Sequence, residues 1–133
     1  MPVPQAPHVV VLDGSPVLAE AYGNLFASAD YRVSTLTDCA VEPAEVLRMI
    51  PDLLVLDLRC GPGLAGLDFL RRLRADPAGR DVPVIASPTI APVDQQAHAA
   101  ELHDLDALLL PEPFTVHDLL ARARAVTSTR RPR

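Results

Sequence analysis

The chain has 133 residues, with 17 acidic side chains against 12 lysines and arginines and a net charge of −5. All twelve of those basic residues are arginine, and the absence of lysine excludes Schiff-base chemistry and the lysine of a phosphate-binding P-loop. The length and a hydrophobic content of 49% predict one folded domain rather than a disordered chain.

Cys39 and Cys60 are the two cysteines of the chain. Two cysteines make neither a disulfide framework nor a four-ligand zinc site, so we expect a protein of the reducing cytoplasm. No apolar run approaches the roughly 20 residues that a membrane-spanning helix needs, and we expect no membrane association.

Apolar segments alternate with helical patterns along the chain. Five segments are predicted to be strands: His8–Leu12, Arg32–Leu36, Leu53–Leu56, Pro83–Ala86 and Ala107–Leu110. The alternating pattern of the second indicates an edge strand, and Pro111 favours an edge position for the last. We expect a disordered segment over 1–7, a domain over 8–125 and an arginine-rich tail over 126–133.

A helix is predicted after each strand. The first begins after Ser15 and Pro16, and its buried face is expected to contain Leu18, Ala21, Tyr22, Leu25 and Phe26. A short helix over Pro43–Ile50 is expected to bury Val46, Leu47 and Ile50. The third is expected to bury Leu67, Leu70 and Leu73, with Arg71, Arg72 and Arg74 outward. The last two lie around Asp94–Leu102 and after the capping residue Thr115, with Val116, Leu119, Leu120 and Ala123 on one face.

Aspartates terminate the two most apolar strands. Asp13 follows the first strand, and Asp57 follows the third. Five βα units imply a parallel, doubly wound sheet, in which ligands and chemistry lie at the carboxyl ends of the strands. Simple capping explains one such aspartate, whereas two of them favour a site.

Five segments carry the more specific motifs: Val10–Pro16, Pro51–Leu58, Leu70–Pro77, Val82–Ala86 and Glu112–Phe114. Together they resemble the receiver domain of bacterial response regulators, the CheY-like superfamily, over about residues 8 to 125. The resemblance implies an α/β fold of the flavodoxin-like type, a doubly wound five-stranded parallel sheet of order 2-1-3-4-5 with five helices. It also implies that Asp57 is the phosphoacceptor position.

Four positions depart from the family pattern. Gly14 replaces the second acid that follows the first strand, and Pro88 stands where a hydroxyl residue is expected, with Ser87 or Thr89 one residue away. Leu109 stands where an aromatic switch residue is common. Glu112 replaces the lysine of the Lys-Pro-Phe motif. We therefore regard Gly14, Ser87, Pro88 and Leu109 as degenerate positions and the domain as an atypical receiver.

The substitution at Glu112 reverses the charge that stabilises a phosphoryl group in this family. The resemblance implies that magnesium and a lysine neutralise the transferred group. Here Asp13, Asp57 and Glu112 supply three carboxylates and no cation. The lost attraction and the new repulsion are each about 4 kcal/mol for unit charges roughly 4 Å apart at an effective dielectric of 20. This balance predicts slow or absent phosphorylation.

A metal hypothesis follows from the same acidic pocket. Asp13 and Asp57, with the backbone carbonyl of Arg59 and a compensating Glu112, are candidate ligands of a weakly bound Mg²⁺. The competing interpretation, which we favour, is that Glu112 turns outward or is protonated by its neighbours. No other cofactor is expected.

Other motifs are weaker. Gly61–Gly66 matches the GxGxxG dinucleotide pattern but begins four residues after Asp57, so we interpret it as a turn. The histidines at 8, 98, 103 and 117 share no metal-ligand spacing, and surface or capping roles are expected. The arginines at 122, 124, 130, 131 and 133 lack nearby aromatics, and nucleic-acid binding is not expected.

Three functions remain. We favour an atypical receiver domain in two-component phosphorelay signalling, acting through regulated protein contacts with weak or no phosphorylation, and not an enzyme. One alternative is a working phosphoacceptor at Asp57 fed by a histidine kinase. The other is a small-ligand sensor that uses the acidic pocket. The expected partner is a histidine kinase or a downstream target, a homodimer stays open, and the usual family surface is the fourth helix, fifth strand and fifth helix.

Overall fold

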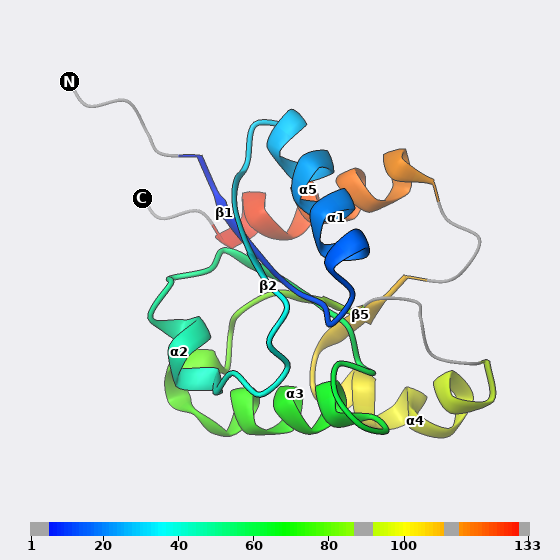
Figure 1. The fold of residues 1–133 in the computed structure, drawn as a ribbon. Helices are drawn as coiled ribbons and strands as arrows, with labels where there is room; N and C mark the ends of the chain where they lie inside the picture. The colour runs from blue at the N-terminus through cyan, green and yellow to red at the C-terminus, as the bar shows by residue number, and fades with distance from the viewer. Residues whose placement is uncertain (1–5, 87–91, 111–114, 131–133) are drawn as a thin grey trace.

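The computed structural model describes residues 6–86, 92–110 and 115–130 of the chain. Its core is a parallel sheet of five strands in the order β2-β1-β3-β4-β5. The strands are β1 His8–Leu12, β2 Arg32–Leu36, β3 Leu53–Leu56, β4 Val84–Ala86 and β5 Ala107–Leu109. The helices are α1 Pro16–Ser28, α2 Pro43–Leu47, α3 Ala65–Ala75, α4 Pro92–Asp104 and α5 Val116–Arg130, and a 3₁₀ turn, η1, covers Pro77–Gly79. The predicted fold class and strand order are confirmed (Figure 1).

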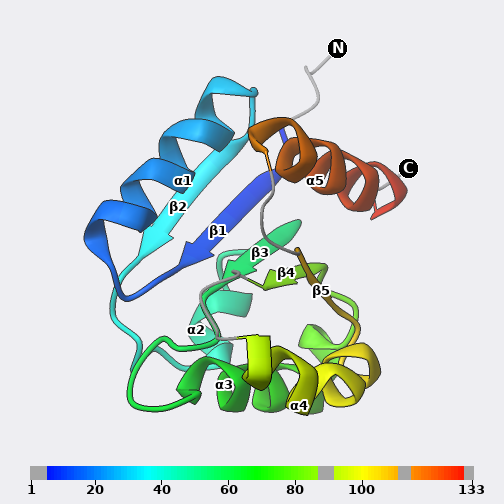
Figure 2. The same ribbon diagram turned by 90° about the vertical axis from the view of Figure 1, so that its right-hand side faces the viewer.

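Helices cover both faces of the sheet. α1 and α5 lie on one face, and α2, α3 and α4 lie on the other (Figure 2). Successive side chains of the central strands point to opposite faces of the sheet and so pack into two separate cores. Val9, Val11 and Val55 pack with Phe26 and Leu119 in one core. The other core contains Val10, Leu12, Leu54, Leu56, Val46, Leu67 and Leu70. Burial on both faces explains why β3 is wholly apolar and why β1 is apolar after His8.

Three predicted helix faces are wrong in detail. In α1 Phe26 is buried as predicted, and Tyr22 and Leu25 pack partly buried against the core, but Ala19 and Gly23 are buried where the prediction had Leu18 and Ala21. α2 ends at Leu47, and Ile50 is 75% exposed with a positive φ of 54°. Val116 in the first turn of α5 is also exposed.

Two described segments extend past the expected boundaries at residues 8 and 125. α5 continues to Arg130, so the helix includes the first residues of the predicted tail, and Thr127 is buried within it. Ala6 and Pro7, which we expected to be disordered, accept hydrogen bonds through their carbonyl oxygens from the Nε and the amide of Arg32. These bonds extend the ordered chain beyond β1.

Two basic side chains are more buried than the sequence suggests. His8 is 8% exposed, and its ring nitrogens lie 2.9 Å from the Met49 carbonyl oxygen and 2.8 Å from the Ser34 hydroxyl. Arg74, which we expected to point outward, donates to five backbone carbonyl groups. Both residues therefore have structural roles.

Among the residues that the structure describes, no helix combines the length and apolarity that crossing a bilayer requires.

Candidate functional site

Asp13 is the most deeply buried acid at the carboxyl edge of the sheet. Its side chain follows β1 and is 2% exposed. The Oδ1 atom accepts a hydrogen bond of 2.9 Å from the amide of Ser15, the residue that caps α1. The Oδ2 atom is buried and has no hydrogen-bond partner among the described residues. An unsatisfied carboxylate oxygen is costly, and it is where a proton or a cation would be stabilised.

Burial raises the pKa of Asp13 above its usual range, and the negative charge of Asp57 raises it further. The hydrogen bond from the Ser15 amide opposes these two effects. Asp13 and Asp57 directly follow Leu12 and Leu56, which are paired in the ladder between β1 and β3, so the two acids lie on adjacent strands at the carboxyl edge of the sheet.

Asp57 lies in the turn that follows β3. Its amide donates to the Leu12 carbonyl, which continues the ladder between β1 and β3. Its carboxylate accepts a 3.0 Å hydrogen bond from the Arg59 amide, and its carbonyl accepts one from the Cys60 amide. The side chain is half-buried, so it is accessible from solvent, in contrast to Asp13.

Gly66 brings α3 against the backbone of this turn. A Cβ atom at Gly66 would lie 2.1 Å from the Asp57 carbonyl oxygen and 2.7 Å from Leu58. No side chain fits there, so glycine is required for the close approach of helix and turn. Gly61 and Gly63 have positive φ values of 93° and 59°. Conformation and close approach thus account for the GxGxxG pattern without a nucleotide.

Gly14 is in contact with the two cysteines. A Cβ at this position would be 3.0 Å from the Cys39 Sγ and 3.8 Å from the Cys60 Sγ. Cys39 follows β2 and Cys60 follows β3, and the two are joined by a disulfide with a Cα–Cα distance of 5.3 Å. The sequence led us to expect no disulfide framework, and this single bridge was missed because cysteines 21 residues apart carry no pairing signal. Sulfur therefore fills the space beside the glycine.

Some predicted site residues lie outside the described residues: Ser87, Pro88, Thr89 and Glu112. Leu109 is described, and it is half-buried on β5, pairs with Ala86 in the ladder, and packs against the core on the α3 and α4 side. A leucine in this position contributes to the core between the sheet and α4.

The metal hypothesis concerns Asp13, Asp57 and the Arg59 carbonyl. The residues that the structure describes contain no cluster of three or more histidine, cysteine or acidic side chains able to hold a metal. Asp13 offers an unpaired buried oxygen and Asp57 a half-buried carboxylate.

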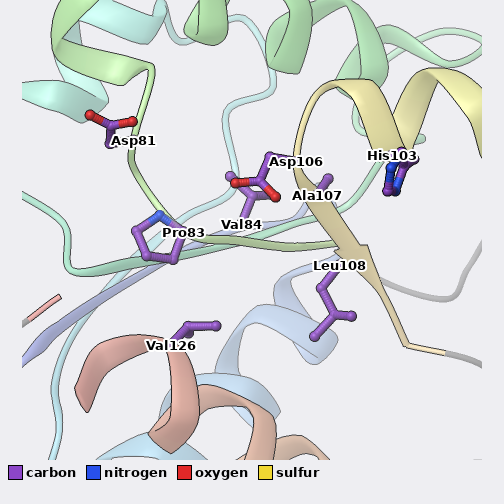
Figure 3. Close-up of a pocket in the computed structure, with 8 residues that line it drawn as sticks. All are labelled: Asp81, Pro83, Val84, His103, Asp106, Ala107, Leu108 and Val126. Atoms are coloured by element: carbon purple, nitrogen blue, oxygen red, sulfur yellow. The ribbon is translucent and has the colours of Figure 1, made fainter. Parts of the chain in front are cut away.

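A hollow of about 550 Å³ lies on the face formed by α4, β5 and α5 (Figure 3). It is near the amino ends of β4 and β5, on the opposite edge of the sheet from Asp13 and Asp57. His103 from α4, Leu108 from β5 and Val126 from α5 line it, together with Asp81 and Asp106. This is the face that the family resemblance implies for partner binding.

Comparison with known proteins places these features in a family. The chain is 28% identical over 120 residues to the DNA-binding dual master transcriptional regulator RpaA of Synechocystis. It is 31% identical over 125 residues to the response regulator MprA of Mycobacterium leprae. These alignments cover 90% and 93% of the chain, and 48% and 52% of the relatives. The chain belongs to the response-regulator receiver family. It spans about half the length of the curated relatives it matches.

Solved receiver structures share the fold. The receiver domain of the sensor histidine kinase PA1611 from Pseudomonas aeruginosa superposes with a TM-score of 0.78, at 23% identity, over 92% of the chain and 98% of that domain. That domain holds a magnesium ion in its active-site cleft. No protein-family model matches the chain.

Proposed function

We propose that this receiver domain acts in two-component signalling through regulated protein contacts, with weak or no phosphorylation of Asp57. The observation that carries the proposal is the environment of Gly14. The family pattern requires an acid there, and in this chain the position is an exposed glycine at which an added Cβ atom would lie 3.0 Å from the Cys39 sulfur. One carboxylate that would hold the catalytic magnesium is absent, and sulfur occupies the adjoining space.

The electrostatics of the edge support the same conclusion. Asp13 and Asp57 already repel each other, and burial raises the pKa of Asp13. A phosphoryl group on Asp57 adds negative charge to this pair. Glu112 replaces the lysine whose positive charge the family uses to balance that addition.

We propose that a cation binds only weakly between Asp13 and Asp57, with the Arg59 carbonyl as a further ligand. Bound Mg²⁺ would supply positive charge to a phosphoryl oxygen. The unpaired Asp13 Oδ2 atom would accept a proton or a cation, and Asp57 is half-buried. A magnesium titration followed by amide shifts at Asp13 and Asp57 tests this, and an absence of response up to tens of millimolar contradicts metal binding.

The partner surface that we propose is the face of α4, β5 and α5. The hollow lined by His103, Leu108 and Val126 gives that face a recess beside an edge strand. The proposed partner is a histidine kinase or a downstream protein target, in the cytoplasm. Because receiver domains are signalling modules, we propose no turnover of a small-molecule substrate.

A phosphorylation assay tests the proposed function. The wild-type chain and Asp57→Asn are incubated with a small phosphodonor and magnesium, and the intact masses are compared. We expect little or no added phosphoryl mass in either protein. Robust labelling of the wild type that disappears in Asp57→Asn overturns the proposal and supports the alternative, a working phosphoacceptor fed by a kinase.

The ligand-sensor alternative has one observation in its favour, the unpaired Oδ2 atom of Asp13. A small cationic ligand at this edge would shift the amides of Ser15 and Arg59, which donate to the two carboxylates. Binding of such a ligand without any labelling of Asp57 would favour the sensor over the contact module.

A further inference from the structure

We propose that Cys39 and Cys60 form a reversible redox modification site that changes the shape of the edge containing Asp13 and Asp57. The oxidised form is the disulfide seen in the structure, and the reduced form is a pair of thiols. This proposal goes beyond the proposed function, because it requires neither phosphorylation nor a metal at Asp57.

The first step of the argument is the position of the bridge. Cys39 lies in the loop between β2 and α2, and Cys60 lies in the loop between β3 and α3. Both loops follow strands at the carboxyl edge of the sheet, and these strands are not neighbours in the sheet, because β1 lies between β2 and β3. The bridge therefore crosses the end of β1, where Asp13 and Gly14 lie.

The second step is contact with the candidate site on both sides. Gly14 follows Asp13, and a Cβ atom added to this glycine would be 3.0 Å from the Cys39 sulfur. Cys60 donates its amide hydrogen to the Asp57 carbonyl at 3.0 Å, within the same turn in which the Arg59 amide donates to the Asp57 carboxylate. Any change in the separation of the two sulfur atoms must alter the space around Gly14 and the turn of Asp57.

The third step is the difference in exposure between the two cysteines, which determines which sulfur atom reacts first. Cys60 is 3% exposed, whereas Cys39 is half-buried and reachable from solvent. Thiol–disulfide exchange requires an in-line approach to one sulfur atom. Cys39 is therefore the sulfur that a small thiol or a small disulfide reaches first.

The chemistry is a two-electron exchange with a low-molecular-weight disulfide. The Cys39 thiolate attacks one sulfur of glutathione disulfide, which breaks the S–S bond, releases one glutathione thiolate and leaves a mixed disulfide on Cys39. The Cys60 thiolate then attacks the Cys39 sulfur and releases the second glutathione. The protein loses two electrons and two protons, and glutathione disulfide gains them. Reduction follows the same steps in reverse.

The proposed location gives a reason for reversibility. A disulfide in a cytoplasmic protein is usually transient and redox-sensing. This reason rests on the location in the proposed function, but the experiment below measures reversibility directly and does not depend on it.

The experiment equilibrates the wild-type chain in buffers of varied reduced-to-oxidised glutathione ratio. Thiols are quantified by alkylation and intact mass, and backbone amide shifts are recorded in each buffer. We expect the chain to change from no alkylated thiols to two, reversibly and without unfolding. We also expect the amides of Gly14, Asp57 and Arg59 to shift together with that change.

Three variants control the experiment. Cys39→Ser should lose all redox-dependent shifts and should resemble the reduced wild type at Gly14 and Asp57. Cys60→Ser should accumulate the mixed disulfide on Cys39, and if this buried substitution prevents folding, Cys39→Ser still decides the question. Thr37→Ser, an exposed change in the same loop, should convert like the wild type.

Each of three results overturns the proposal. The bridge could remain oxidised until the chain unfolds, which makes it a structural disulfide. The cysteines could remain reduced in every buffer. The pair could convert while shifts stay confined to the loop of Cys39. None of these results bears on the labelling of Asp57, so this proposal and the proposed function fail independently.

Discussion

The two edges of the sheet differ in how a charged side chain is hydrogen-bonded: Arg74 is half-buried at one edge, and Asp13 is buried at the other. At the amino ends of β4 and β5, the Arg74 guanidinium donates to the carbonyl oxygens of Leu105 and Val82 at 2.7 Å and of Gly79 at 2.8 Å. It also reaches the carbonyls of Arg80 and Asp106 at 3.2 Å. At the carboxyl edge, Asp13 is almost fully buried, and one of its oxygens has no partner in the described part of the chain.

The difference separates a structural charge from a functional one. The Arg74 guanidinium, in the last turn of α3, donates to backbone carbonyls at the end of η1 and just before β4 and β5. Its role is therefore structural. Asp13 is left incompletely satisfied beside Asp57, which costs stability and leaves capacity for a proton, a cation or a partner. The two edges therefore differ in whether the charged side chain has its hydrogen-bonding capacity filled, as that of Arg74 is and that of Asp13 is not.

Removal of Arg74 should have the largest effect. Arg74→Ala leaves several part-buried carbonyls unpaired and should lower the free energy of unfolding by roughly 4 kcal/mol. Denaturant unfolding measures this loss of free energy. Arg72→Ala is the matched control on the same helix, since Arg72 makes only exposed ion pairs with Glu42 and Asp68, and it should cost less than about 1 kcal/mol. Equal losses in the two variants would contradict a structural role for Arg74.

Loss of the disulfide should have the next largest effect, since the carboxyl edge is tied covalently. Cys39→Ser should be less stable than the oxidised wild type by about 3 kcal/mol, the chain-entropy value for a loop of this length. The melting temperature should fall by roughly 10 °C. In a strongly reducing buffer the wild type and Cys39→Ser should have the same melting temperature. A difference in melting temperature that persists there would show that the serine itself, and not the lost disulfide, destabilises the variant.

Gly66→Ala should disturb the turn of Asp57. The added Cβ overlaps the Asp57 carbonyl oxygen, so α3 must move away, and we expect a loss of roughly 2 kcal/mol. Gly63→Ala is the control, because its Cβ meets nothing within 4 Å and it should cost about 1 kcal/mol for its positive φ. Only Gly66→Ala should shift the Asp57 and Arg59 amides. The same shifts in both variants would show that the close contact is not the cause.

Neutralising Asp13 should have the smallest effect and the opposite sign. Burial and Asp57 raise the pKa of Asp13 in the folded state, so the folded chain keeps this proton to higher pH than the unfolded chain does. Stability therefore falls as the pH rises from the unfolded pKa to the folded pKa, and the full penalty is present above the folded pKa. Asp13→Asn should stabilise the protein by about 1 kcal/mol at neutral pH.

This gain should vanish below the unfolded pKa of Asp13, where the wild-type carboxyl is protonated in both states. Urea unfolding at neutral and acidic pH measures the difference. Asp104→Asn, at an exposed position near the end of α4, is the matched control. A destabilised Asp13→Asn at neutral pH would mean that the charge is compensated by a group that binds the Oδ2 atom.

The sequence predicts the strands and their carboxyl-edge aspartates because apolar runs and their terminating residues are local signals. It misses the contact of Gly14 with Cys39 and Cys60, which depends on two loops that meet only in the folded chain. It also misplaces Arg74, because helical spacing gives a face but not the carbonyl groups that a long side chain reaches. The burial of the Asp13 Oδ2 atom, which has no hydrogen-bond partner among the described residues, likewise depends on tertiary packing.

The burial of α1 shows the same limit. Leu18 belongs to a regular apolar stripe, yet Ala19 and Gly23 face the sheet, and Leu18 instead lines an open apolar groove with Val116 and Leu119 of α5. Periodicity finds the helix, whereas the choice between two adjacent stripes depends on how closely the helix approaches the strands.

Labelling of Asp57 in charge variants at position 112 tests the central claim most directly. The initial rate with a small phosphodonor and magnesium is compared among the wild type, Glu112→Gln and Glu112→Lys. If the charge at position 112 limits phosphorylation, Glu112→Lys should react faster than the wild type by on the order of a hundredfold, with Glu112→Gln between them. A wild type that labels as fast as Glu112→Lys would contradict the account.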